Sequence, residues 1–281
     1  MWRRGNSLWL GVLAVLAGLI ASASVARAEE QVDLALVLTV DVSLSMDLDE
    51  QRLQRDGYVA AFRDPLVLAA IASGTHRRIA VTYVEWAGPF TQATVLSWTL
   101  IDGAAAAERF AGSLESKPIS RARMTSISGA LAYADRLLEK SPYSAPRLVI
   151  DVSGDGPNNS GAHIVPIRDE LVARGIIING LPLMLKTGGE YGNFDIPNLD
   201  QYYADCVIGG PGSFSIPVRE KAEIGAAIRQ KLVLEIADLG SPRPPIRAQF
   251  IPAQVVPKPA AADCLIGEKL WQRYIDGRDF R

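Results

Sequence analysis

The sequence predicts an α/β protein built on a doubly wound, mostly parallel sheet with helices on both faces. A nearly unbroken apolar stretch, Val32–Val40, is typical of a central strand that is buried on both faces. Strand-like and helix-like segments then alternate along the chain, which is the pattern of a parallel sheet with helical crossovers. With 281 residues, of which 48% are hydrophobic, the chain is long enough to bury one large core.

The individual elements follow from caps, breakers and hydrophobic periodicity. Asp47 and Asp49 supply a cap and first-turn acids for a helix that runs up to Pro65. The clearest helical stripe follows Thr125, where apolar residues recur with helical spacing. The predicted strands are 32–40, 78–86, 93–101, 148–152, 176–185 and 213–218, and the predicted helices are 47–65, 103–114, 130–138, 164–175 and 219–236.

The amino end has the three-part layout of a secretory signal. Two arginines precede an apolar run from Leu8 to Ala21, and small residues follow up to Ala28. The alternative, a retained membrane anchor, is disfavoured because about 14 apolar residues fall short of the roughly 20 that cross a bilayer core. We therefore expect residues 1–28 to be removed and the mature protein to be exported, periplasmic or secreted, without a membrane span.

Charge and cysteine content bear on the kind of partner and on a possible disulfide. Removal of the predicted signal, with its three arginines and no acid, leaves 26 basic residues against 31 acidic ones. This acidic balance argues against nucleic acid as the partner. Cys206 and Cys264 are the two cysteines of the chain, and an exported protein with an even count is expected to pair them in a disulfide. The alternative is two buried free thiols.

The composition changes near residue 240. Prolines crowd the sequence from there to Pro259, and they cannot continue a helix or a central strand. We predict a domain over 29–239 and a proline-rich tail over 240–281 with a short helix at 265–275. That helix is expected to fold back on the domain, with partner binding by its aromatic residues as the alternative. The glycine-rich and aromatic segment 188–195 is expected to be a rim loop near the site or a plain solvated loop.

Oxygen-bearing side chains follow three of the predicted strand ends. The set consists of Asp41, Ser43, Ser45, Thr125 and Asp155. Ligands in open α/β sheets bind beyond the carboxyl ends of the strands, where these residues stand. Carboxylates and hydroxyls suit Mg²⁺, Mn²⁺ or Ca²⁺, whereas zinc takes mostly nitrogen and sulfur ligands. The alternative is structural, with Asp41 and Ser43 capping a helix and Asp155 making a turn.

Three neighbouring side chains leave alternatives open. Asp151 lies in the strand before Asp155, and either carboxylate could face the cation; Asp155 is preferred because it lies at the turn. Asn158 and Asn159 could support the site from behind, but a role as ordinary loop residues is favoured.

The pattern resembles the metal-ion-dependent adhesion site of von Willebrand factor type A domains. The resemblance is carried by Asp-x-Ser-x-Ser at 41–45, by Thr125 five residues before the Ala130-Leu131 pair, and by the post-strand pair Asp155-Gly156. It covers roughly residues 32–238 and implies a Rossmann-like α/β fold. In that family the serines and the threonine approach the metal, and the aspartates bind it directly or through water. The resemblance assigns these roles to the same five residues here.

A narrower resemblance points to a family of exported proteobacterial proteins classed as a domain of unknown function. It is carried by the segment 41–46 with the following 53–58, and by Cys206-Val207-Ile208-Gly209-Gly210.

These residues predict a binding module that grips an acidic side chain of a protein partner through its cation. One alternative is a metal-independent scaffold that uses the same fold. Another is a Mg²⁺-dependent hydrolase, which is disfavoured because Ser43 stands where a phosphatase of the haloacid dehalogenase type needs a second aspartate. Catalysis is not expected.

Overall fold

The computed structural model describes residues 29–185, 195–237 and 260–277 of the chain. The chain divides into two units, Met1–Glu30 and Gln31–Arg281, and the fold described below is that of the second. The predicted signal peptide, most of the 188–195 loop and most of the proline-rich tail lie outside the described residues. No helix within the described ranges is long and apolar enough to span a membrane.

A five-stranded sheet with the order β4-β3-β2-β6-β7 forms the centre of the fold. Strand β2 pairs in parallel with β3 and β6, β6 pairs in parallel with β7, and only the edge strand β4 is antiparallel, to β3. This confirms the predicted mostly parallel sheet. The strands are β2 (Ala35–Asp41), β3 (Ile79–Trp86), β4 (Gln92–Ile101), β6 (Leu148–Gly154) and β7 (Ile177–Pro182), with the two-residue strands β1 (Glu30–Gln31) and β5 (Tyr143–Ser144) outside the sheet.

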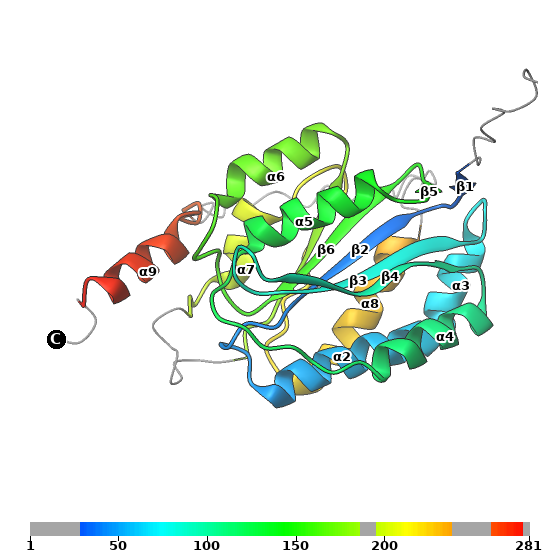
Figure 1. Ribbon diagram of the computed structural model, residues 1–281, viewed down its shortest axis with the longest axis horizontal. Helices are drawn as coiled ribbons and strands as arrows, with labels where there is room; N and C mark the ends of the chain where they lie inside the picture. The colour runs from blue at the N-terminus through cyan, green and yellow to red at the C-terminus, as the bar shows by residue number, and fades with distance from the viewer. Residues whose placement is uncertain (1–28, 186–194, 238–259, 278–281) are drawn as a thin grey trace, which may run out of the picture. The chain divides into compact units, whose positions relative to one another are not determined.

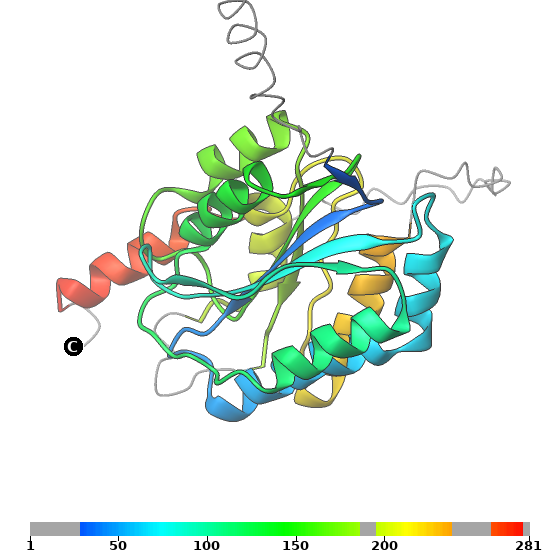
Figure 2. The same ribbon diagram turned by 45° about the vertical axis from the view of Figure 1, so that its right-hand side comes forward.

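Helices cover both faces of this sheet, as Figure 1 and Figure 2 show. Helices α2, α3, α4 and α8 pack into one apolar core, and α5, α6 and α7 pack into the core on the opposite face. The helices are α2 (Leu48–Arg63), α3 (Pro65–Ser73), α4 (Ala104–Glu115), α5 (Ile127–Glu139), α6 (Ile164–Ala173), α7 (Leu199–Tyr202) with a π-helical turn at Tyr203–Val207, α8 (Ile224–Ile236) after a 3₁₀ turn at Lys221–Glu223, and α9 (Ile266–Ile275).

Strand β2 is apolar throughout because it feeds both cores. Leu36 and Leu38 join the core under α2 and α8, whereas Ala35 and Val37 join the core under α5. Every residue of the strand is buried. The alternation of a strand therefore places successive apolar side chains in two different cores, which explains the unbroken hydrophobic run.

The segment 213–218 and the region after Pro65 differ from the predicted elements. The segment 213–218 forms no strand; its backbone pairs with β7 and the residue after it at single bridges, Gly180 with Ser215 and Leu183 with Val218. Pro217 lacks the amide hydrogen that continuous pairing would need. Helix α3 was not predicted: Pro65 does not end the helical region but opens a second helix as its first residue, capped by the Asp64 side chain.

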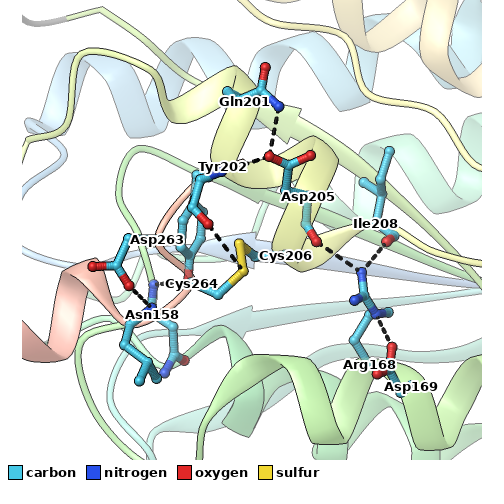
Figure 3. The surroundings of a disulfide bond; sticks show 12 residues. Asn158, Arg168, Asp169, Gln201, Tyr202, Asp205, Cys206, Ile208, Asp263 and Cys264 are labelled. Carbon is cyan, nitrogen blue, oxygen red and sulfur yellow. Dashed lines mark hydrogen bonds and ion pairs between the residues drawn. A yellow bond between two sulfur atoms is a disulfide. The ribbon is translucent and has the colours of Figure 1, made fainter. Parts of the chain in front are cut away.

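The carboxyl-terminal segment is tied to the domain by a disulfide. Cys206 and Cys264 are bonded, with their Cα atoms 5.5 Å apart, so the predicted pairing is confirmed (Figure 3). Asp205, beside this bond, accepts hydrogen bonds from the Gln201 side chain at 2.7 Å and from the Ala262 amide at 2.8 Å. The disulfide and these contacts fix the start of α9 against the turn after α7.

Candidate functional site

Four of the predicted site residues form one continuous chain of oxygen contacts. The Ser43 amide donates to Asp41 Oδ1 at 2.7 Å, and the Ser43 and Ser45 hydroxyl oxygens lie 2.7 Å apart. The Ser45 hydroxyl then donates to Asp155 Oδ1, also at 2.7 Å. Asp41 ends β2, and Asp155 directly follows the neighbouring parallel strand β6. The carboxyl ends of these two strands therefore bring the motif at 41–45 and Asp155 together.

Thr125 lies in a third loop that is bonded to the other two. The Ala122 amide donates to the Val42 carbonyl at 3.2 Å, which joins this loop to the end of β2. Thr125 is buried, and its amide donates to the Asn159 side chain at 2.9 Å while the Asn159 amide donates to the Thr125 carbonyl at 2.8 Å. Met124, just before it, has a left-handed backbone with φ of 72°. The three predicted loops thus meet at one edge of the sheet.

The Asp41 carboxyl is the most electrostatically perturbed group of this set. It is fully buried, and burial raises its pKa well above the usual 3.8, with the nearby charge of Asp155 raising it further. Its second oxygen, Oδ2, has no hydrogen-bond partner within the described residues. A buried carboxylate oxygen that lacks a partner is costly unless a proton or a cation neutralises it.

Tyr203 is a site residue that the sequence analysis missed. Its hydroxyl donates to the Gly154 carbonyl at 3.4 Å. A Cβ atom placed on Gly154 would lie 3.0 Å from both Asp41 Oδ2 and the Tyr203 hydroxyl oxygen, so these two groups crowd the same small space. Burial raises the pKa of Tyr203 well above its usual 10, and the charges of Asp41 and Asp155 raise it further. Gly154 before Asp155 was the only hint of this close approach in the sequence.

The two asparagines after Asp155 are not ordinary loop residues. Asn158 is 0% exposed and Asn159 is 8% exposed. The Asn158 side-chain oxygen accepts from the Ser128 amide at 3.0 Å, and its nitrogen donates to Glu268 of α9 at 2.8 Å. Both asparagines therefore satisfy backbone groups around the Thr125 loop. The favoured role as ordinary loop residues was wrong, because the Asn158 side chain bonds to α5 and to α9.

Asp151 does not belong to this set. Its side chain lies on the face covered by α8, where Lys231 Nζ is 2.6 Å from Asp151 Oδ1. Asp155, by contrast, follows the last residue of β6 and accepts a hydrogen bond from Ser45, so it is the carboxylate that lies with the motif at 41–45.

The side chains at this edge offer oxygen donors alone. Within the described ranges, no three His, Cys, Asp or Glu side chains are grouped in a way that could hold a metal. A cation here would have two carboxylates and the hydroxyls of Ser43, Ser45 and Thr125, which is a hard donor set. The assignment of these five residues as metal ligands stays a prediction.

A cavity of about 350 Å³ lies beside Asp155. Its wall is mixed, with the apolar side chains of Met184 and Ile196 and the charged side chains of Glu50 and Arg219. Asp155 and Ser45 are themselves only partly buried. The open side of the oxygen cluster therefore faces a hollow of the size that a side chain or small group can enter.

Solved structures with similar folds define the class of the domain. Proximal thread matrix protein 1 from the mussel byssus is 13% identical with a TM-score of 0.54, over 74% of this chain and 49% of that one. A von Willebrand factor type A protein from Catenulispora acidiphila is 16% identical with a TM-score of 0.50, over 73% and 43%. The pilus adhesin SpaC from Lactobacillus rhamnosus GG is 11% identical with a TM-score of 0.52, over 73% and 31%.

These likenesses identify the fold as von Willebrand factor type A-like. The chain spans less than half the length of each of these three proteins. A second structure of the mussel protein, with a TM-score of 0.50 and 14% identity over 73% of this chain and 46% of that one, is described as having a zinc-occupied MIDAS motif.

The family follows from the sequence itself. The profile of the family "Protein of unknown function (DUF1194)" matches residues 31–240, which is most of the chain. The protein therefore belongs to this family. A search of curated proteins gave no match.

Proposed function

We propose that this protein is a binding module that holds a divalent cation at Asp41, Ser43, Ser45, Thr125 and Asp155 and uses it to grip an acidic side chain of a protein partner. The observation that carries the proposal is the buried Asp41 carboxylate, whose Oδ2 has no hydrogen-bond partner within the described residues and which lies close to a second carboxylate. A dication between the two would neutralise both charges.

The donor set leaves room for a ligand from outside. The protein supplies only two carboxylates, which balance the charge of a dication without exceeding it, so the cation can still accept a further carboxylate in place of a water. The hydroxyls of Ser43, Ser45 and Thr125 are neutral donors and do not change this balance. A partner Glu or Asp would replace a water on the open side, next to the cavity beside Asp155.

Mg²⁺ is the proposed cation, with Mn²⁺ or Ca²⁺ as alternatives, because the donors are all oxygen. Zinc belongs in the same measurements, since the mussel byssus protein of similar fold has a structure described with zinc in its MIDAS motif.

The proposal is one of binding without catalysis. Ser43, two residues after Asp41, cannot serve as the acid or base that a phosphatase of the haloacid dehalogenase type needs there. Export to the periplasm or the medium is part of the proposal; the signal-like amino end supports it, and so does the disulfide, which persists in oxidising compartments.

Calorimetric titration of the metal-free protein with Mg²⁺, Mn²⁺, Ca²⁺ and Zn²⁺ tests the site directly. The wild type is expected to bind one cation, and Asp41→Ala and Thr125→Ala are expected to lose that binding. Asp102→Asn is the matched control, because Asp102 is an exposed aspartate after β4, away from the three loops.

The partner is tested by a pull-down from the envelope fraction of the source organism, run with the cation and again with chelator. Capture that depends on the cation, is lost in Thr125→Ala and persists in Asp102→Asn supports the proposal. Capture that survives both chelation and Thr125→Ala would favour the metal-independent scaffold instead.

A further inference from the structure

A second polar cluster lies inside the core, on the face of the sheet opposite α5. Lys231 and Glu235 come from α8 and Asp151 comes from β6, and each of the three is 1% exposed. Lys231 Nζ is 2.6 Å from Asp151 Oδ1 and also contacts the Glu235 carboxylate. A primary amine and two carboxyl groups are thus held together away from water.

The surroundings of the cluster fix each member in place. The Tyr58 hydroxyl donates to Asp151 Oδ2 at 3.3 Å, and the Asn179 side chain donates to Glu235 Oε1 at 3.0 Å. Lys231 Nζ lies 5.9 Å from the centre of the Phe214 ring. The cluster therefore sits in a buried space where a tyrosine, an asparagine and an aromatic ring hold its members in place.

One amine and two carboxyls cannot all be paired as charges in this space. Burial raises the pKa of Glu235 to about 7, and the charge of Asp151 contributes in the same direction. Burial also raises the pKa of Asp151, although Lys231 opposes this rise. Burial thus favours the neutral form of each of the two carboxyl groups.

We propose that Lys231 and Asp151 condense into a side-chain amide, with Glu235 as the proton carrier. One proton first passes from the Lys231 ammonium to the Asp151 carboxylate. The neutral Nζ then attacks Asp151 Cγ, forming the C–N bond. Glu235 takes a proton from the nitrogen and delivers it to the departing hydroxyl oxygen; the C–O bond breaks and water leaves. No oxidant or reductant is needed, and Glu235 ends in the form in which it began.

Two features of the cluster support this step, the contact between the reacting groups and their burial. Two reacting groups held in contact behave as if at very high concentration, with effective molarities of about 10⁵–10⁸ M in well-oriented cases. Burial also excludes the water that would drive hydrolysis of the amide. A buried ion pair, by contrast, gains little stability over apolar packing because its desolvation is costly. The amide would lock α8 covalently to the central sheet.

The chain contains a matched control pair. Lys269 Nζ lies 2.6 Å from Asp263 Oδ2, the same separation as in the buried pair, but the two side chains are 57% and 45% exposed. If proximity alone or sample handling produced an amide, this pair would form one as well. The proposal requires burial and a neighbouring acid, so the exposed pair is expected to stay unlinked.

Mass spectrometry of the purified full-length protein tests the proposal. The intact mass is expected to be lower by one water molecule than the mass calculated, with the disulfide, for the chain that starts at the amino terminus found in the purified protein. After trypsin digestion, the peptide 148–168 is expected to be joined to the peptide that begins at Gln230. A wild-type mass with no loss of water, or a cross-link that involves the Lys269–Asp263 pair instead, overturns the proposal.

Two variants separate the roles. Asp151→Asn is expected to give the same cross-linked product as the wild type, because its amide group releases ammonia where the acid releases water. Glu235→Gln keeps the size of the side chain and is expected to abolish the cross-link. Its intact mass should then show no loss of water. Full cross-linking in Glu235→Gln would overturn the role of Glu235, and an Asp151→Asn product that differs in mass from the wild-type product would overturn the amide. The wild-type measurement stands even if a variant fails to fold.

Discussion

Replacing Asp41 by Asn should raise the stability of the cation-free domain at neutral pH. The same substitution should abolish the stabilisation that a cation gives to the wild type. The substitution keeps an oxygen that can accept the Ser43 amide at the position of Oδ1, which now lies 2.7 Å from that nitrogen. It removes the buried negative charge close to Asp155. The two effects have opposite signs, so a variant that was simply unfolded could not imitate them.

The expected stabilisation of the wild type by the cation follows from mass action. A cation present at 100 times its dissociation constant stabilises the folded state by about 2.7 kcal/mol. For a domain of this size about 1 kcal/mol shifts the melting temperature by about 2–4 °C. The wild type should therefore melt about 5–11 °C higher with saturating cation than with chelator. Asp41→Asn should show no such difference.

The pH dependence has a definite sign. The folded pKa of Asp41 is raised above its usual 3.8, so the folded state without cation keeps a proton that the unfolded chain has already released. Its contribution therefore lowers stability progressively as the pH rises from 3.8 through the raised folded value. A bound cation replaces this proton, so stabilisation by the cation grows over the same window. Asp41→Asn should lack both trends.

Differential scanning fluorimetry at several pH values, with cation and with chelator, measures both the cation-induced shift in melting temperature and its pH dependence. Asp102→Asn, the exposed aspartate control, should match the wild type throughout. If Asp41→Asn keeps the full cation-induced shift in melting temperature, Asp41 holds no cation and the proposed site is wrong. If Asp41→Asn is much less stable than the wild type in chelator at neutral pH, the inferred electrostatic cost of Asp41 is wrong.

Three further predictions test the framework around the site. Cys206→Ser should lower the free energy of unfolding by about 4 kcal/mol in urea titrations, since the disulfide closes a loop with a sequence separation of 58. An equal loss of stability when the wild type is reduced would show that the loss comes from the disulfide bond. Gly267→Ala should cost about 1–3 kcal/mol and weaken cation binding, because its Cβ would lie 2.0 Å from a backbone oxygen of the loop after Asp155. Gly225→Ala, with open space around it, is the control that should cost nothing. Glu85→Ala should cost about 3–5 kcal/mol because it leaves Arg55 buried without its ion-pair partner; a loss below 1 kcal/mol in the same titration would show that the pair is not needed.

Local patterns in the sequence were enough to predict the layered fold. The buried run of β2 and the alternation of strands with helices gave the class, and the rule that ligands bind at strand ends selected the three loops that the structure brings together. These features could be predicted because each depends on spacing within a few residues. The disulfide was also predictable, since the chain has two cysteines and one pairing.

Other features were decided by contacts between residues far apart in the chain. Tyr203 reaches the space beside Asp41 because the π-helical turn packs across the end of β6, and no local spacing encodes that approach. Asp151 lies within β6 and contacts Lys231 of α8, whereas Asp155 follows the end of the strand and contacts Ser45. Asn158 is buried because α9 covers it from more than a hundred residues away. The sequence by itself determined most of the strands and helices of the sheet layers, because periodicity is local, but not the fate of 213–218 or helix α3. Only the tertiary structure decided which polar side chains share a buried space, because burial depends on what packs over them.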